Sequence, residues 1–336
     1  EVEVSASIDY EVTVEESASK WLIYNSTRAM TTLTHVFTAD YYEDASGALR
    51  TGEIRFSNAL YDISAAIVVK QSPKIPEGGG GGISTAADLM GFAAAVNAGA
   101  STARWENEAG EVVLLNDIDM AAVESWTPIG GVDASEYNTT TPYKTVNPFK
   151  GTFDGQGYAL KNLKLAYGGS AVNTAYGLFG VLDGATVRNL TVGAALGDAS
   201  ALKVTASGGT AEVGVIAGVC RDANVSDCVN YAKIEYDGTS TARVSAAMVG
   251  FIFSETEGTK LERLQNYGAV EADTHGNSAN GAGAAIHMAG ICGFATGNAT
   301  NKICNDIAYC DNYGNITSNS ARSSGIVAAA NTFTRI

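Results

Sequence analysis

Asp117 and Asp119, in the stretch LLNDIDM, have a spacing that could support chemistry. On a β-strand, alternate residues would face inward, namely Leu114, Asn116, Ile118 and Met120. Both aspartates would then face outward, about 6 to 7 Å apart along the strand. That separation suits an acid/base pair or two ligands of a calcium ion. The alternative that we favour is a role at a sheet edge or turn, where their charge opposes end-to-end association.

No other catalytic pattern stands out. The three histidines, His35, His275 and His287, form no HExxH motif and no Ser/His/Asp order. Basic residues such as Arg188 and Lys233 are scattered, whereas a polysaccharide lyase needs a basic proton acceptor and further cations. The net charge of −15 also disfavours anionic polymers, nucleic acid and anionic membranes. We therefore predict no catalytic residue and no cofactor, with calcium at the aspartate pair as the weaker alternative.

Binding by polar loops is better supported. Long loops rich in Asn, Ser, Thr, Gly and Tyr interrupt the apolar runs, and such residues stack on sugars or adapt hydrogen bonds to a partner. The tyrosines of these loops are the predicted ligand-binding residues, namely Tyr137, Tyr143, Tyr167 and Tyr176.

The elements that must position these residues are mainly strands. The chain has 336 residues, 38 glycines and only 5 prolines, and Thr, Val, Asn and Ser are abundant, which is typical of a β-rich protein with many turns. No stretch of 18 apolar residues is present. The five cysteines form no CxxC pair, and their odd number leaves at least one free thiol.

Composition divides the chain into three parts. The stretch SPKIPEGGGGG predicts a flexible linker over residues 73–83. Before it, alternating apolar runs predict a small antiparallel sandwich over residues 1–72. After it, STAADLMGFAAAVNAG predicts one helix, at about 85–98, which caps the open end of a stacked β-structure covering 84–336.

Repeats organise the third part. Four Gly-flanked apolar runs are each followed by a second run, which begins at Val187, Val225, Leu261 or Ile307. Three residues later each copy has an apolar residue, namely Leu190, Cys228, Leu264 or Cys310. Stacked coils would place these residues in one ladder, with the cysteines acting as small buried hydrophobic residues.

Two further patterns are read as structural. Asn230, Asn266 and Asn312 align across the repeats, and we favour an internal asparagine ladder over a recognition row. In GTFDGQGYALKNL, Asp154 opens a glycine-containing turn between two strands. We interpret that stretch as scaffold.

The first 72 residues resemble a known module. Trp21, Arg50 ahead of Ile54 and Phe56, and a last strand closing on IVVKQ at Gln71 are similar to the BACON domain of Bacteroidetes surface proteins. The resemblance implies an immunoglobulin-like β-sandwich. The family name suggests carbohydrate binding, but no exposed aromatic cluster supports it here, and we favour a spacer.

Residues 84–336 resemble GLUG-type repeats of bacterial surface proteins. VVLLNDIDM, SWTPIG, FKGTFDGQGYALKNL and the pairs ending in CVNYAKI, LQNYGAV and CDNYGNI carry the resemblance. It implies a right-handed parallel β-helix on an exported, adhesin-like protein. It also assigns the NDID segment and Trp126 to the general repeat pattern.

Together these observations predict a mainly β extracellular protein, anchored at the outer membrane as a lipoprotein through a segment outside this chain. The predicted function is non-enzymatic, adhesin-like binding of a host glycoprotein, mucin, polysaccharide or other surface protein. Two alternatives stay open. One is a β-helix carbohydrate-active enzyme, either a lyase or a glycoside hydrolase, which paired carboxylates beside an exposed Lys or Arg would favour. The other is a structural stalk.

Overall fold

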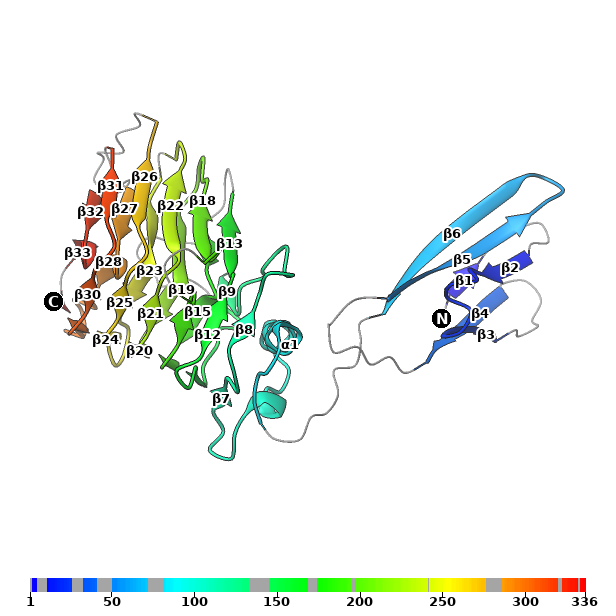
Figure 1. Ribbon diagram of the computed structural model, residues 1–336, viewed down its shortest axis with the longest axis horizontal. Helices are drawn as coiled ribbons and strands as arrows, with labels where there is room; N and C mark the ends of the chain where they lie inside the picture. Colours follow the sequence, from blue (N-terminus) through cyan, green and yellow to red (C-terminus); the bar gives the residue numbers. More distant parts are fainter. Residues whose placement is uncertain are drawn as a thin grey trace. The chain divides into compact units, whose positions relative to one another are not determined.

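The computed structural model describes residues 2–4, 11–25, 33–40, 50–71, 81–132, 145–168, 174–194, 198–240, 242–275, 286–319, 322–331 and 333–336. The chain divides into two compact units, Glu1–Gly79 and Gly80–Ile336. Both are built mainly of β-strands (Figure 1). Most of the predicted linker lies outside the described residues.

The described residues of the first unit form two three-stranded antiparallel sheets. In order across each sheet, the strands are β1 (Val2–Val4), β4 (Leu33–Ala39) and β3 (Leu22–Asn25), and then β2 (Glu11–Val14), β5 (Arg50–Asn58) and β6 (Ile63–Gln71). Gly52, Ile54 and Phe56 of β5 are buried while the residues between them are more exposed, which is the period of two that the sequence predicted.

Residues far apart in the first unit meet at one edge of its core. The guanidinium of Arg50 lies 4.2 Å from the centre of the Trp21 ring, and Arg50 Nε donates a hydrogen bond to Gln71 Oε1 at 2.8 Å. Trp21 packs with Ile54 and Phe56 in the same apolar cluster. All five residues named for the BACON resemblance therefore take part in these contacts.

The second unit begins with the predicted helix, α1 (Ala86–Asn97). Thr85 Oγ1 accepts from the Asp88 backbone N–H, and Asp88 Oδ2 accepts from that of Thr85, so a capping box starts the helix. Gly99, with φ of +65°, ends it. Among the described residues, no helix is long and apolar enough to cross a membrane.

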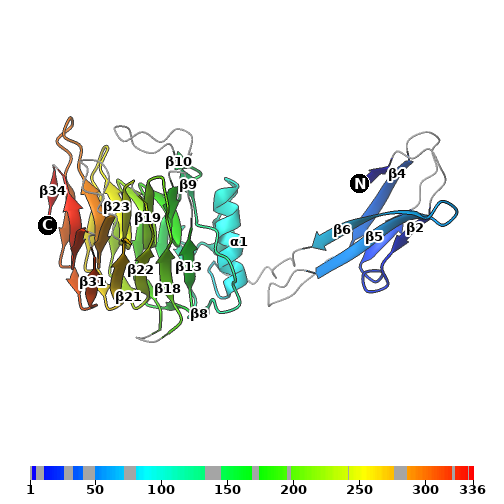
Figure 2. The same cartoon turned by 90° about the horizontal axis from the view of Figure 1, so that it is seen from above.

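The buried face of α1 packs against the first coil of strands. Phe92 makes edge contacts with Trp105, of the short 3-10 helix η1 (Ala103–Trp105), and with Phe149, at 5.8 and 5.5 Å between ring centres. Leu89 and Phe92 are fully buried. The helix lies beside the first strands of the stack (Figure 2), as the capping prediction requires.

Among the described residues that follow the helix, four parallel sheets, here called walls 1 to 4, are stacked as a β-helix. Wall 1 contains β7 (Val112–Val113), β11 (Thr152–Asp154), β16 (Thr186–Arg188), β20 (Asn224–Ser226), β24 (Lys260–Glu262), β29 (Asn305–Ala308) and β34 (Thr334–Arg335). Wall 2 contains β8 (Ile118–Asp119), β12 (Ala159–Lys161), β17 (Thr191–Val192), β21 (Val229–Asn230), β25 (Gln265–Asn266) and β30 (Asp311–Asn312).

Wall 3 contains β13 (Lys164–Tyr167), β18 (Ala201–Val204), β22 (Lys233–Asp237), β26 (Val270–Asp273) and β31 (Ile316–Ser318). Wall 4 contains β14 (Thr174–Tyr176), β15 (Phe179–Asp183), β19 (Ala211–Arg221), β23 (Val244–Phe253), β27 (Ile286–Ala289), β28 (Cys292–Thr296), β32 (Arg322–Ser324) and β33 (Val327–Ala330). A small antiparallel hairpin joins β9 (Gly131–Val132) and β10 (Thr145–Val146).

The register confirms the predicted ladder. Val187, Val225, Leu261 and Ile307 are direct neighbours on successive strands of wall 1. The next position of the ladder is filled by Leu190, Cys228, Leu264 and Cys310, of which the first three are fully buried and Cys310 is partly buried. Burial raises the pKa of the Cys228 thiol to about 12, so Cys228 stays protonated and packs as a small hydrophobic residue.

At four successive coils a left-handed residue turns the chain from wall 1 into wall 2. Asn189, Asp227, Arg263 and Tyr309 have φ values of 52°, 54°, 54° and 57°. Asn and Asp tolerate this conformation, whereas Arg and Tyr adopt it at a cost. The corner is therefore imposed by the stacking of coils rather than by local preference.

The asparagine row is internal, as favoured from the sequence. Asn230 Nδ2 donates to Asn266 Oδ1, and Asn266 Nδ2 donates to Asn312 Oδ1, both at 2.7 Å. Each amide also donates to the backbone carbonyl two residues further on. The row links three coils through the inside of one corner.

Candidate functional site

The outer face of wall 3 carries ordered polar rows. In β22 and β26 the side chains alternate, with Ile234 and Val270 fully buried and Glu235 and Glu271 facing out. Glu235 is the direct neighbour of Glu271, and Asp237 is the direct neighbour of Asp273. Thr317 of β31 continues the first of these rows. Four carboxylates are thus held in a two-by-two array by the register of two strands.

These rows line a groove of about 600 Å³. Its walls come from three successive coils and comprise Glu235, Tyr236, Asp237, Glu271, Ala272, Asp273, His275, Thr317, Ser318 and Asn319. The carboxylate side chains of Asp237, Glu271 and Asp273 are between 43 and 54% exposed, and a ligand can therefore reach them. The groove is predominantly acidic.

Two lysines at one side of the groove form ion pairs with its glutamates. Lys233 Nζ lies 2.8 Å from Glu271 Oε2 and 3.1 Å from Glu235 Oε2, and Lys203 Nζ lies 3.5 Å from Glu235 Oε1. The hydrogen bond from Lys233 lowers the pKa of Glu235. Glu235 is therefore held in its ionised form, as a hydrogen-bond acceptor.

His275 closes the other side of the groove. Its Nε2 lies 2.6 Å from Asp237 Oδ1, and this contact raises the pKa of His275. Asn319 Nδ2 and the backbone N–H of His275 both donate to Asp273 Oδ1 at 2.8 Å, and these bonds lower the pKa of Asp273. This side of the groove therefore contains both carboxylate acceptors, from Asp237 and Asp273, and side-chain nitrogens, from His275 and Asn319.

A column of tyrosines lies where the chain enters wall 3, two residues before Lys233 in the first of the three coils. The rings of Tyr231 and Tyr267 stack 5.0 Å apart, and those of Tyr267 and Tyr313 stack 4.7 Å apart, with interplanar angles of 18° and 16°. Because the stacked rings cover each other's faces, the column exposes ring edges and hydroxyl groups to a ligand. The terminal ring, Tyr313, is 58% exposed.

The aspartate pair predicted from the sequence is already engaged. Asp117 accepts a hydrogen bond from the Ala159 backbone N–H at 2.9 Å and lies 2.6 Å from Lys161 Nζ, which lowers its pKa. Asp119 Oδ1 accepts from Asn162 Nδ2 and from the Ala121 backbone N–H, and its pKa is lowered as well. These contacts fit the favoured role at a sheet edge and turn.

One detail of that segment was predicted incorrectly. Leu114, Ile118 and Met120 are buried, but Asn116 is exposed and its Nδ2 donates to the carbonyl oxygens of Ser84 and Asp117. Asp154 does accept from the Gln156 backbone N–H at 2.8 Å, as a turn residue would. It is also buried against Arg188, whose Nε donates to Asp154 Oδ2 at 2.8 Å.

The four predicted tyrosines do not form a described site. Tyr137 and Tyr143 lie outside the described residues. Tyr167 and Tyr176 are neighbours, with 5.7 Å between ring centres, but both are half-buried and pack against the main core. Burial raises the pKa of both hydroxyls. These two tyrosines offer less contact area than the loop pattern suggested.

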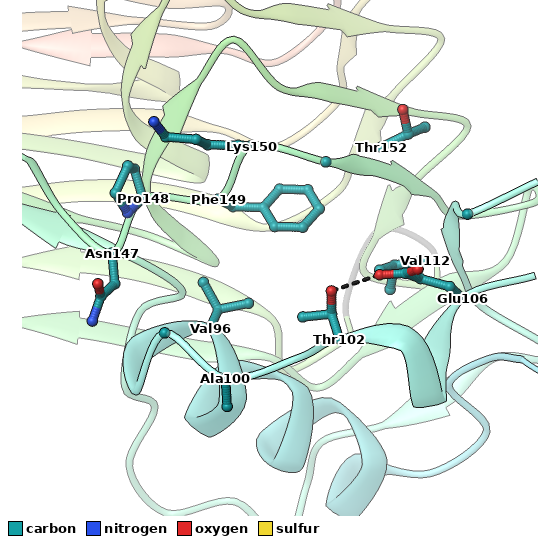
Figure 3. Close-up of a pocket in the computed structure, with 13 residues that line it drawn as sticks. Val96, Ala100, Thr102, Glu106, Val112, Asn147, Pro148, Phe149, Lys150 and Thr152 are labelled. Carbon is teal, nitrogen blue, oxygen red and sulfur yellow. Dashed lines mark hydrogen bonds between the residues drawn. The ribbon is translucent and has the colours of Figure 1, made fainter.

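A second hollow of about 450 Å³ lies between α1 and the first coil (Figure 3). Its floor includes Val96, Val112 and the ring of Phe149, while Thr102 Oγ1 donates to Glu106 Oε1 at 2.6 Å at one rim. Lys150 also lines it, but its Nζ lies 3.4 Å from Asp183. Thr102, Glu106 and Lys150 are thus already engaged with partners within the protein, and the groove on wall 3, with its four carboxylates, is the stronger candidate.

Metal binding and known relatives give no further assignment. Within the described ranges, no group of three or more His, Cys, Asp or Glu side chains is placed to hold a metal ion. Comparisons with protein-family models, with curated proteins and with solved structures find no match for this chain. The chemistry of the groove is therefore argued from its own residues.

The residues of the groove were not predicted, although the repeats carry a signal for them. Extending the repeat alignment beyond the asparagines pairs YAKIEYD, YGAVEAD and YGNITSN, which begin at Tyr231, Tyr267 and Tyr313. On a strand, their alternate positions place four rows on one face, namely tyrosine, then lysine, alanine or asparagine, then glutamate or threonine, then aspartate or asparagine. The last two of these rows line the groove.

Proposed function

We propose that this chain is an adhesin-like, cell-surface protein that binds glycans of a host glycoprotein, mucin or polysaccharide through the outer face of wall 3. One observation carries the proposal, namely the accessible groove in which carboxylates, an amide and hydroxyls repeat from coil to coil. A repeating array of acceptors suits the repeating hydroxyl groups of a saccharide chain. The resemblance to GLUG-type and BACON-containing surface proteins supports an exported location.

Charge selects among glycans. The groove contains Glu235, Asp237, Glu271 and Asp273, and the whole chain carries a net charge of −15. Sialylated, sulfated or uronate-rich chains would be repelled, whereas neutral or amino-bearing sugars can donate hydrogen bonds to the carboxylates. We therefore propose neutral or amino-bearing glycans as the ligand class.

A binding screen tests this proposal. An array of neutral, amino-bearing, sialylated and sulfated glycans and mucins would be probed with the native chain and with the double variant Glu235→Gln, Glu271→Gln. We expect binding to neutral or amino-bearing glycans, weakened at least tenfold in the variant, which corresponds to about 1.4 kcal/mol. The matched control is Asp117→Asn, because it neutralises an exposed, lysine-paired carboxylate just before β8 of wall 2, outside the groove. Equal binding by all three proteins would contradict the proposal.

A glycoside hydrolase is the second candidate, because paired carboxylates lie beside Lys233 in one groove. Neighbouring coils are about 4.8 Å apart, and residues i and i+2 on a strand are about 7 Å apart. Both spacings are near those of glycosidase carboxylate pairs, which are about 5 to 9.5 Å apart. A general acid needs a raised pKa, however, whereas the pKa values of Glu235 and Asp273 are lowered.

An assay for newly released reducing ends separates the two candidates. We expect no release from any glycan that binds. Release that disappears in both Glu235→Gln and Glu271→Gln, while binding persists, would assign the groove to hydrolysis.

A further inference from the structure

Strand β6 of the first unit has an open edge. It spans nine residues, Ile63–Gln71, and pairs on one side with β5. In the described part of the chain, no strand pairs with its other side. Val68 and Ile63 are 60 and 56% exposed. A long apolar edge of this kind presents unpaired N–H and C=O groups to any strand that can add to it.

The strand lacks the features that usually protect an edge. Its sequence, ISAAIVVKQ, contains no proline or glycine, and its charge is confined to its ends, with Asp62 just before it and Lys70 near its end. Ala65 and Ile67 are opposite Phe56 and Ile54, two buried residues of the core. Ile67 is nevertheless 38% exposed, so the core is open along this edge.

We propose that two copies of this chain associate through antiparallel pairing of their β6 strands, with Ala66 of one copy opposite Ala66 of the other. This arrangement has two-fold symmetry, which is the commonest form of homodimer. The pairs that it creates across the interface are Asp62 with Lys70, Ile63 with Val69, Ser64 with Val68, and Ala65 with Ile67.

Charge complementarity favours a second copy of this chain as the partner of β6, and it favours this register. Asp62, in the turn just before β6, and Lys70 are each four residues from Ala66 in the sequence, so an antiparallel second copy brings each lysine close to an aspartate at both ends of the interface. Sliding the strands by two residues loses both charge pairs. On the face toward the core, Ile63, Ala65, Ile67 and Val69 would meet the same residues of the second copy and extend the apolar cluster.

The first experiment measures the mass of the full chain by analytical ultracentrifugation between 1 and about 200 μM. We expect a concentration-dependent species of twice the 34.7 kDa of one chain. Ala66→Glu should weaken this dimer at least tenfold, because it places two carboxylates opposite each other at the symmetry axis. Within one copy, the new glutamate lies opposite Arg55 and is tolerated.

The matched control is Thr13→Glu. Thr13 is exposed on the other edge strand, β2, and is also opposite Arg55, so this variant adds the same charge beside the same arginine. It should leave the dimer unchanged. Circular dichroism of both variants confirms that the fold is kept.

A charge exchange tests the register. Lys70→Asp and Asp62→Lys should each weaken self-association, because like charges then meet at both ends. Mixing the two variants should restore a dimer of the native affinity, because every contact is again between opposite charges. A chain that stays monomeric at 200 μM, a dimer that survives Ala66→Glu, or a mixture that fails to associate would overturn the proposal.

Discussion

Two rows of residues run along one corner of the β-helix, adjacent in sequence and on opposite sides of the wall. Asn230, Asn266 and Asn312 face inward, and the first two are fully buried. The tyrosines that follow them face outward, and the last of these, Tyr313, is 58% exposed. Both rows are stacked, but one is held by amide hydrogen bonds and the other by ring contacts.

The two rows differ in what the loss of one repeated residue would do. Inside, each amide satisfies the next, so a single change leaves buried donors and acceptors without partners. Outside, each ring adds contact area but water can replace it. Identical residues inside therefore set the register, whereas identical residues outside build a surface whose chemistry can vary from coil to coil.

One of the two largest predicted effects comes from a substitution in the inner row. Asn266→Ala removes the partner of Asn230 Nδ2, of Asn312 Oδ1 and of the Gly268 carbonyl. At about 1 kcal/mol for each unpaired group, the free energy of unfolding should fall by about 3 kcal/mol. Urea denaturation followed by circular dichroism measures this loss.

The outer row provides the matched variant. Tyr267→Ala removes a half-buried ring that stacks on two others and should cost about 1.5 kcal/mol. If Asn266→Ala and Tyr267→Ala lowered the free energy of unfolding equally, the inner and outer rows would contribute equally to stability. That result would contradict the difference between the two rows.

A pH titration of His287 extends the comparison, because this residue faces outward yet is buried. Its ring stacks on Phe294 at 5.2 Å and is 4% exposed. Desolvation, with Arg322 and Arg243 nearby, lowers the pKa of His287 to about 4. The unfolded chain therefore binds a proton below about pH 6.5 that the folded chain does not bind until about pH 4, so stability falls as pH falls.

The loss attributable to His287 should reach about 3 kcal/mol between these pH values. The measurement compares urea unfolding of the native chain and of His287→Phe at pH 7 and pH 4.5. The variant should lose clearly less stability on acidification. Parallel pH profiles for the two proteins would show that the imidazole does not titrate on unfolding in this range.

The smallest predicted effect concerns the corner between walls 1 and 2. Tyr309 has a φ of 57° and its side chain is 81% exposed, so it bears the cost of the left-handed conformation with little burial in return. Tyr309→Asn should raise the free energy of unfolding by about 0.5 to 1 kcal/mol. A lower thermal unfolding midpoint for this variant would show that the tyrosine makes stabilising contacts at the corner.

The repeats predicted the interior well because burial restricts residue type. Leu190, Cys228 and Leu264 differ in chemistry but share one buried position, and their spacing alone placed them there. The binding surface was harder to predict, because outward residues follow no hydrophobic pattern. Asp117 and Asp119 were candidates because they are two positions apart in the sequence. Glu235 and Glu271 are 36 positions apart and become neighbours only through the register of β22 and β26.

Carboxyl footprinting of the glycan-bound chain tests the central claim most directly. Surface carboxylates would be labelled with a carbodiimide and an amine, with and without an excess of a binding glycan, and located by mass spectrometry. Our account predicts protection at Glu235, Asp237, Glu271 and Asp273, with unchanged labelling at Asp117. Protection on another wall, with the groove labelled equally in both samples, would contradict it.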